Sequence, residues 1–353
     1  MGFEQDSGSH SRISPSGMAR VVQCPGSVRM EEKYPRPRGD AANEGTRAHS
    51  IAAQMLRGIP SGGTADEAVT MYVDDVLSTV EQRSCGLDIE HKIDISGIMA
   101  GMVGTPDAVA KDYIRRDAII WDFKYGWGLV DEWHNWQGIC YIAGIYEQWI
   151  EKYEFRVVQP RPWCNRGRIR RWIVTPSELM PLITIAKNAC ALALSDNPPL
   201  ATGRECRYCG ALLYCPAAAD TAHHALDVTE GFNDIPSMDY GAALTVLTSA
   251  KDIITQRITA LEEHIVSQIK AGQQVRGWAM EKTHGRLEWT RPDAEIVFMG
   301  TMLGVDLRSD GAKTPKQCER VLSVPVMQML TKQEGKYKLI PDGGNKARQI
   351  FGG

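Results

Sequence analysis

The chain has 353 residues, of which 43% are hydrophobic and 24% charged, and its formal net charge is -3. This composition is ordinary for a soluble globular protein, and the length suits about two domains. No apolar run approaches the roughly 20 residues of a membrane span. Residues 1–17 lack the apolar core of a secretory signal, so we expect a disordered polar lead and a cytoplasmic protein with no membrane contact. The small net charge neither indicates nor excludes nucleic-acid binding, because local patches decide that.

Hydrophobic periodicity predicts an ordered series of helices and strands in the first part of the chain. They are a helix over 44–56, strands over 87–96, 100–110 and 117–123, a helix over 134–153, strands over 155–160 and 168–175, and a helix over 175–194. This order predicts a mixed α/β sandwich rather than a repeated doubly wound pattern.

The character of the sequence changes after a cysteine-rich stretch at 206–215. Long helical periodicity over 238–272 is followed by a possible hairpin over 278–290, with a His-Gly pair at its turn. We therefore place a domain boundary near residue 227. This gives a first domain over 18–227 and a C-terminal α+β extension over 228–353, in which we find no catalytic constellation.

A charged pair ends one of the apolar strand candidates, in the sequence WDFKYG at 121–126. On a strand, Asp122 and Lys124 point to the same face, and a hairpin would bring Asp107 beside Asp122. Two such carboxylates repel unless a divalent cation lies between them, and oxygen ligands favour Mg²⁺ or Mn²⁺. Lys124 could then orient an attacking water and counter charge on a phosphate. Taken alone, D-x-K more often marks a surface ion pair.

Further residues around this pair form an ordered set. Gln137 and Tyr141 lie four apart, on one face of a predicted helix, and His49 lies on the first predicted helix, where a lone His is more often structural. In chain order, the set resembles the RecB-like branch of the PD-(D/E)XK nuclease superfamily. That branch has a His on the first helix, a G-x-x-D strand, a D-x-K strand and a Q-x-x-x-Y helix. The stretches EGTRAH and WDFKYGWG also resemble a phage and prophage group of such nucleases, and the resemblance covers roughly residues 18–225.

The resemblance implies a restriction-endonuclease-like core, in which helices flank a central mixed sheet. It also implies a role for each matching residue. Glu90, in the strand before GTPD, could lie near the site but has less weight, because an exposed strand Glu is common. The implied roles are metal ligation by His49, Asp107 and Asp122 with the carbonyl of Phe123, activation of water by Lys124, and positioning of DNA by Gln137 and Tyr141.

Three cysteines are clustered as Cys206, Cys209 and Cys215, with the spacing C-x2-C-x5-C. In a reduced protein such a cluster indicates a metal site, and Cys24 is the best candidate for a fourth ligand. One cysteine before the nuclease motifs and three after them is similar to the iron–sulfur RecB-like nucleases, among them AddB and the CRISPR-associated nucleases. The resemblance implies a 4Fe–4S cluster that staples the helical part of the domain. Structural zinc is the main alternative, and free thiols are the least favoured.

Residues 155–172 contain six arginines and no acidic residue. A basic hairpin there, with Arg166, Arg168 and Arg170, could follow DNA phosphates, and a solvated hairpin is an equal alternative. Trp127, on the loop after the D-x-K strand, is a candidate for stacking on unpaired bases, although aromatic packing is the safer interpretation.

These observations together predict a metal-dependent DNA nuclease, and the resemblance implies an exonuclease of phage recombination, repair or DNA processing. It would act on single-stranded DNA or duplex ends in a bacterial host cell, with a single-strand annealing protein or another recombination protein as partner. The alternative is a non-catalytic iron–sulfur or zinc subunit that binds DNA as a scaffold and has a vestigial nuclease site. The C-terminal extension suits oligomerisation, partner docking or a DNA-entry wall equally.

Overall fold

The computed structural model describes residues 11–35, 40–60, 65–230, 240–289, 291–308 and 330–341. The chain divides into two compact units, residues 1–257 and 258–353. The domain boundary near residue 227 stays a prediction. Within the predicted lead, residues 1–10 lie outside the described residues, whereas Ile13 is buried in the core and Pro15–Gly17 form the 3-10 turn η1.

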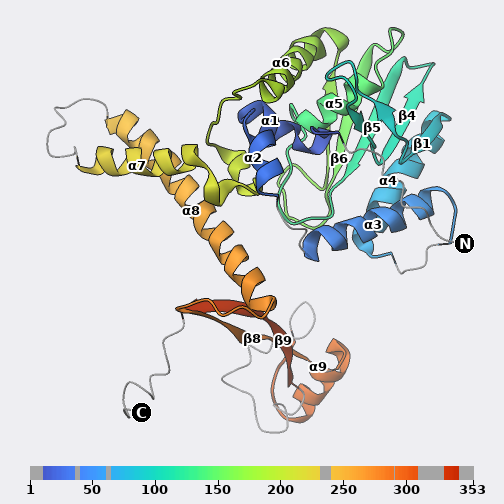
Figure 1. The fold of residues 1–353 in the computed structure, drawn as a ribbon. Helices are drawn as coiled ribbons and strands as arrows, with labels where there is room; N and C mark the ends of the chain where they lie inside the picture. The colour runs from blue at the N-terminus through green and yellow to red at the C-terminus, as the bar shows by residue number, and fades with distance from the viewer. Residues whose placement is uncertain are drawn as a thin grey trace, which may run out of the picture. The chain divides into compact units, whose positions relative to one another are not determined.

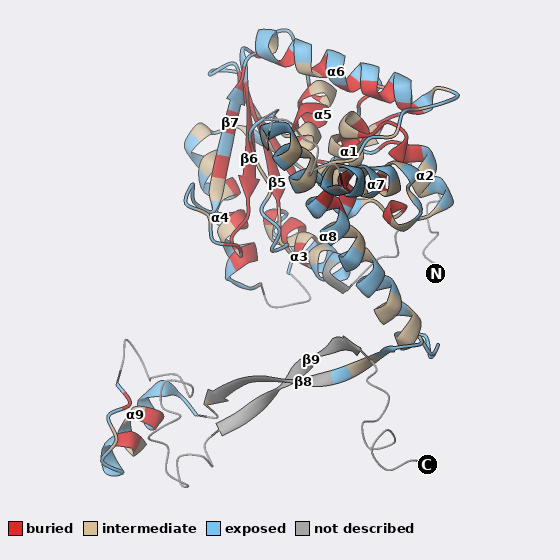
Figure 2. Cartoon of the chain, turned by 90° about the vertical axis from the view of Figure 1, so that its left-hand side faces the viewer, coloured by how far each residue is buried: buried red, intermediate tan, exposed pale blue. Residues whose placement is uncertain are grey.

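A mixed five-stranded sheet lies at the centre of the first unit, in the order β1-β4-β5-β6-β7 (Figure 1). β5 pairs antiparallel with β4 and parallel with β6, and the two outer pairs, β1–β4 and β6–β7, are antiparallel. Every residue of β5 is buried, as are most residues of β6 (Figure 2), which explains the apolar run Ala118–Trp121 in β5. The predicted central mixed sheet is confirmed. Its strands are β1 (Gly86–Ile89), β4 (Ala108–Asp112), β5 (Asp117–Phe123), β6 (Lys152–Val158) and β7 (Ile169–Val174).

Helices cover both faces of this sheet, as predicted (Figure 1). α3 (Asp40–Leu56) and α4 (Glu67–Arg83) pack on one face, in a core that includes Trp121. α1 (Met18–Gln23), α5 (Trp136–Gly144) and α6 (Pro176–Leu194) pack on the other, in a core that includes Ile120. Because side chains alternate along a strand, Asp122 shares the α5 face with Ile120, and Phe123 shares the α4 face with Trp121. The other described α-helices of this unit are α2 (Ser27–Lys33), α7 (Pro216–Glu230) and the first part of α8 (Tyr240–Lys270).

Three predicted elements end earlier than expected because the chain turns inside them. The strand over 87–96 breaks at Glu90, whose φ of 49° is left-handed, and becomes β1 and β2 (Ile93–Asp94). The strand over 100–110 becomes β3 (Val103–Gly104), which pairs with β2, and β4. The helix over 134–153 ends at Gly144, and the chain enters β6 at Lys152. These turns place Glu90 and the GTPD segment at strand ends, where their side chains can meet.

Among the described helices, α6 alone is long and apolar enough to cross a membrane by length and composition. It begins with a capping box in which Thr175 accepts a hydrogen bond from the amide of Glu178 and the Glu178 carboxylate accepts one from the amide of Thr175. Its inner face, which includes Leu179 and Ile183, packs into the core of the first unit. This is the pattern of a core helix in a globular protein.

The described part of the second unit contains the end of α8 (Tyr240–Lys270), β8 (Trp278–Trp289), α9 (Asp293–Met302) and β9 (Leu330–Pro341). β8 and β9 pair antiparallel from Trp278 opposite Pro341 to Trp289 opposite Leu330. The predicted hairpin over 278–290 is therefore wrong, because the His-Gly pair continues β8 instead of turning the chain. Register shifts on both sides of His284 accommodate this segment within the ladder.

Candidate active site

His49, Glu90 and Asp107 converge at the edge of the central sheet. His49 comes from α3, Glu90 directly follows β1, and Asp107 directly precedes β4. One possible ligand atom from each lies within 4.8 Å of the other two. The antiparallel register explains the meeting, because Ile89 pairs with Ala108 and the amide of Glu90 donates to the carbonyl of Asp107 at 3.1 Å. The fold thus holds an imidazole and two carboxylates together.

The Asp107 carboxylate connects three elements at this point. Its Oδ1 lies 2.8 Å from Nδ1 of His49, and its Oδ2 accepts a hydrogen bond from the backbone amide of Phe123 at 2.6 Å. The rings of His49 and Phe123 also pack, with their centroids 5.3 Å apart. Asp107 is therefore fixed from both sides, by α3 and by the end of β5. The ligand role expected for the Phe123 carbonyl stays a prediction.

Lys124 heads a chain of hydrogen bonds that ends on the backbone. Its Nζ donates to Oε1 of Gln137 at 2.8 Å, and Nε2 of Gln137 donates to the Tyr141 hydroxyl at 3.0 Å. That hydroxyl donates to the carbonyl of Thr105 at 3.2 Å. Lys124 Nζ also lies 3.0 Å from Oδ2 of Asp122, although that buried oxygen is not aligned for a hydrogen bond. The four predicted residues Asp122, Lys124, Gln137 and Tyr141 are thus brought together.

The close approach of α5 to the sheet places Gln137 within reach of Lys124. Asn135 caps this helix by accepting a hydrogen bond from the amide of Gly138 at 3.0 Å. A Cβ atom at Gly138 would lie 2.7 Å from the Phe155 ring, which is closer than real Cβ contacts. Glycine at this position lets the helix lie directly on β6.

The electrostatics of the site reflect crowded carboxylates. Burial raises the pKa of Asp122, the charge of Asp107 raises it further, and the charge of Lys124 opposes both. Burial and the charge of Asp107 likewise raise the pKa of Glu90. Burial lowers the pKa of His49, but its hydrogen bond to Asp107 and the nearby carboxylate charges outweigh this, so the pKa is raised. A bound cation would relieve this repulsion among the acids.

Glu90 is the residue whose place in the site the sequence underweighted. It joins His49 and Asp107 in the group of three, whereas Asp122 is not one of the donors within 4.8 Å of one another. A signal for Glu90 was present, because it stands at the end of a strand that can form a hairpin with the GTPD strand. Histidine nitrogen with carboxylate oxygens suits Mn²⁺ or Mg²⁺, so this donor set fits a divalent cation.

The four cysteines predicted to hold a metal group lie together in the first unit, apart from the candidate cation site. Cys24, Cys206, Cys209 and Cys215 line one small cavity, which α1 and the segment after α6 enclose. The amides of Ala201 and Gly203 donate to the sulfurs of Cys24 and Cys206, each at 3.3 Å. Burial raises the pKa of Cys209 to about 11, so the free thiol stays protonated. The structure therefore brings the four predicted cysteines together, and four sulfur donors around one cavity fit a thiolate-bound metal group.

The arginines predicted to contact DNA all lie against carboxylates. Arg170 is buried and pairs with Glu132 at 3.2 Å, Arg166 pairs with Asp131 and Glu132, and Arg168 pairs with Glu67. Ion pairs inside the protein thus offset part of the positive charge of this hairpin, and the burial of Arg170 makes it a structural residue.

Trp127 lies on the surface rather than in the core. Its side chain is 65% exposed, and the guanidinium of Arg161 lies 4.6 Å from the centre of its ring. The aromatic-packing interpretation is therefore wrong for this residue, because no core covers the ring. An exposed indole beside a guanidinium is suited to stacking on a base, and this role stays a prediction.

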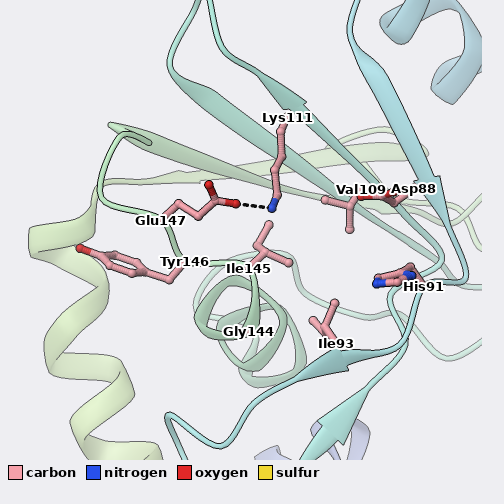
Figure 3. A pocket seen from close by; sticks show the side chains of 9 residues that line it. All are labelled: Asp88, His91, Ile93, Val109, Lys111, Gly144, Ile145, Tyr146 and Glu147. Atoms are coloured by element: carbon pink, nitrogen blue, oxygen red, sulfur yellow. Dashed lines mark hydrogen bonds and ion pairs between the residues drawn. The ribbon is translucent and has the colours of Figure 1, made fainter.

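A separate pocket lies beside β1 and β4 (Figure 3). Asp88, His91, Lys111 and Glu147 are among its lining residues, and Lys111 points toward Glu147, with 2.5 Å between Nζ and Oε1. None of the three converging ligand residues lines it. This pocket is therefore separate from the candidate cation site.

Comparisons with known proteins give one family and several distant structures. A family model described as "Protein of unknown function (DUF2800)" matches residues 10–66 and 63–339. The crystal structure of SSO0001 is similar at 19% identity over 57% of this chain and 85% of that chain, with a TM-score of 0.30. An alkaline exonuclease from Laribacter hongkongensis is similar at 13% identity over 51% of this chain and 87% of that chain, with a TM-score of 0.27. TM-scores this low do not establish a shared fold.

Proposed function

The chain belongs to the DUF2800 family, and from its site we propose that it is a metal-dependent DNA nuclease. One observation carries this proposal. An imidazole and two carboxylates lie within 4.8 Å of one another, beside a buried aspartate whose lysine partner is held by a glutamine. Cation ligands next to a fixed ammonium are the groups that phosphodiester hydrolysis requires.

We propose that His49, Glu90 and Asp107 hold the cation, which is Mg²⁺ or Mn²⁺. When bound, the cation would supply Lewis-acid stabilisation of the charge that develops on the phosphate. Asp107 contributes through fixed geometry, since its two oxygens are already oriented by His49 and by the Phe123 amide. The sequence-based assignment of Asp122 as a further ligand stays a prediction, and in this proposal Asp122 holds Lys124.

Lys124 is the residue that would meet the substrate. Its ammonium is held between Asp122 and Gln137, at 3.0 and 2.8 Å. From there it would orient a water for attack and counter the phosphate charge. Tyr141 fixes Gln137 in turn, so the hydrogen-bond chain from Thr105 to Lys124 sets the position of the amine before substrate arrives.

DNA is the proposed substrate, attacked from single-stranded or duplex ends by an exonuclease of phage recombination or repair. The support is the ordered set of RecB-like motifs on the residues that the fold brings together. Trp127, exposed on the loop after Lys124, is proposed to stack on an unpaired base. A recombination partner and a cytoplasmic location complete this proposal.

We also propose that the four cysteines hold a 4Fe–4S cluster. The support is that the four sulfurs line one cavity, and that one cysteine precedes the nuclease motifs while three follow them, as in the iron–sulfur RecB-like nucleases. Structural zinc is the alternative. The role of the cluster would be structural, because it would tie the segment around Cys24 to the segment after α6.

Cleavage of linear DNA tests the nuclease proposal. Purified full-length protein is incubated with single- and double-stranded DNA labelled at either end, with Mg²⁺, Mn²⁺ or a chelator. We expect metal-dependent degradation, and we expect Lys124→Ala to slow it by about 100-fold or more, the usual cost of losing one electrostatic stabiliser. A covalently closed circle distinguishes exonuclease from endonuclease action.

Lys111→Ala is the matched control, because it removes another partly exposed, ion-paired lysine that is not part of the proposed site. Its cleavage rate should stay near that of the wild type. If the wild-type protein cleaves neither substrate with either metal, the nuclease proposal is wrong.

A further inference from the structure

The hydroxyl of Tyr72 is a buried polar group that forms no hydrogen bond. Tyr72 lies on α4 and is 1% exposed, and its oxygen is one of four buried side-chain atoms without a partner in the described part of the chain. Buried hydroxyls are normally bonded, and an exception calls for a missing ion, a missing water or a functional role. Phenylalanine would fill the same space without this cost.

The position of Tyr72 connects it to the proposed cation site. Its ring stacks on Phe123 with centroids 4.7 Å apart, and His49 packs against the same Phe123 ring. The amide of Phe123 holds Asp107. Tyr72 therefore approaches the group of His49, Glu90 and Asp107 from α4, on the face of the sheet opposite α5.

Two acids of this group also act on the Tyr72 hydroxyl electrostatically. Burial raises the pKa of Tyr72 well above its ordinary value, and the charges of Asp107 and Glu90 are the next largest causes. A tyrosine hydroxyl can donate one hydrogen bond. Asp107 already uses both carboxylate oxygens, whereas in the described part of the chain no hydrogen bond reaches the Glu90 carboxylate. Glu90 is the acceptor that remains open.

We propose that Tyr72 is a positioning residue whose hydroxyl donates to the Glu90 carboxylate when His49, Glu90 and Asp107 hold a divalent cation. This inference rests on the proposed function, because it requires that cation. A carboxylate that binds a cation through one oxygen is free to rotate unless its other oxygen is held. Losing such a supporting hydrogen bond typically weakens metal affinity by about 10–100-fold.

Tyr72→Phe tests the proposal, because it keeps the stacked ring and removes only the unbonded oxygen. The probe is Mn²⁺ alone, titrated into the full-length protein without DNA and followed by calorimetry or by electron paramagnetic resonance. We expect Mn²⁺ to bind at least 10-fold more weakly than to the wild type. The Tm of the metal-free protein should not fall, since no native hydrogen bond is lost.

Tyr153→Phe is the matched control with the opposite expectation. Tyr153 is also buried, but its hydroxyl accepts a hydrogen bond from the amide of Glu147 at 3.0 Å, on β6 and outside the site. Removing that oxygen leaves the amide without its partner. The Tm should therefore fall, while Mn²⁺ affinity stays within about 3-fold of the wild type.

The outcomes separate this inference from the proposed function. If the wild type binds Mn²⁺ and Tyr72→Phe binds it equally well, the role of Tyr72 is overturned and the cation site stands. If Tyr72→Phe loses affinity and Tm together, the residue is merely structural and the inference is overturned. If the wild type binds no Mn²⁺, the cation site itself is overturned, and the role of Tyr72 with it.

Discussion

Replacing Asp107 by asparagine should remove metal binding with little loss of stability. The carboxylate makes two hydrogen bonds, to His49 at 2.8 Å and to the Phe123 amide at 2.6 Å. A bond to a charged group contributes about 1.5–3 kcal/mol and a neutral bond about 0.5–1.5, so two bonds lose roughly 2 kcal/mol together. Against this, two charges about 4.8 Å apart repel by about 3 kcal/mol at an effective dielectric constant of about 20. The ligand atoms of Asp107 and Glu90 are no farther apart than that.

These opposing terms are of similar size, so the metal-free Asp107→Asn protein should unfold within about 4 °C of the wild type. The effect of metal is different, because one anionic ligand is gone. Mn²⁺ at 100 times its Kd should stabilise the wild type by about 2.7 kcal/mol, which is about 5–11 °C for a unit of this size. We expect this rise in Tm, and DNA cleavage, to be absent in Asp107→Asn.

Asp112→Asn is the control, since Asp112 is an acid at the opposite end of β4 from Asp107 and lies outside the proposed site. It accepts hydrogen bonds from the amides of Ile114 and Arg115, both at 3.0 Å. Thermal unfolding with and without Mn²⁺ should show the metal-induced rise intact in this variant. A rise in Asp107→Asn equal to that of the wild type would refute the assignment of Asp107 as a ligand. So would an equal loss in both variants.

Three further outcomes follow from the structure. Mn²⁺ affinity should fall as pH falls, because the raised pKa of His49 keeps its ring protonated, and unable to ligate, up to a higher pH than free imidazole. Calorimetry in buffers of different ionisation enthalpy should show that Mn²⁺ binding releases protons. Proton uptake on binding would contradict this. The Cβ atom of Gly138→Ala should lie 2.7 Å from the Phe155 ring, and this clash should lower the free energy of unfolding by about 1–3 kcal/mol. In a thermal scan the Tm should fall by about 2–12 °C. An unchanged Tm would contradict the close packing. After anaerobic purification, the Cys209→Ser protein should contain no iron or sulfide, whereas the Cys164→Ser protein should contain both. Stoichiometric zinc without iron in the wild type would overturn the cluster proposal.

Local sequence was sufficient for the elements that carry the lysine. β5 has the predicted bounds, 117–123, because a strand buried on both faces appears as a continuous apolar run that ends at charged residues. Gln137 and Tyr141 could be paired because their spacing of four is a helical repeat. Each of these inferences needs only neighbours within a few residues, and the structure brings all three residues together around Lys124.

Glu90 and Tyr72 show where sequence reasoning stopped. The place of Glu90 depends on the register of β1 with β4 and on a left-handed turn at Glu90 itself, and neither follows from one sequence. α4 was not predicted, although Val69, Tyr72 and Val73 have helical spacing after Asp66, which caps the helix. Without that helix, nothing placed the Tyr72 hydroxyl beside the carboxylates.

The position of Glu90 changes what Asp122 can do. Oδ2 of Asp122 lies 3.0 Å from the Lys124 ammonium, so a cation bound at that oxygen would repel the ammonium that the same oxygen holds. With Glu90 beside His49 and Asp107, two carboxylates balance a divalent charge without drawing on Asp122. Asp122 is then free to keep Lys124 in place while the cation is bound. In the proposed site, the D-x-K motif therefore acts as the holder of its lysine.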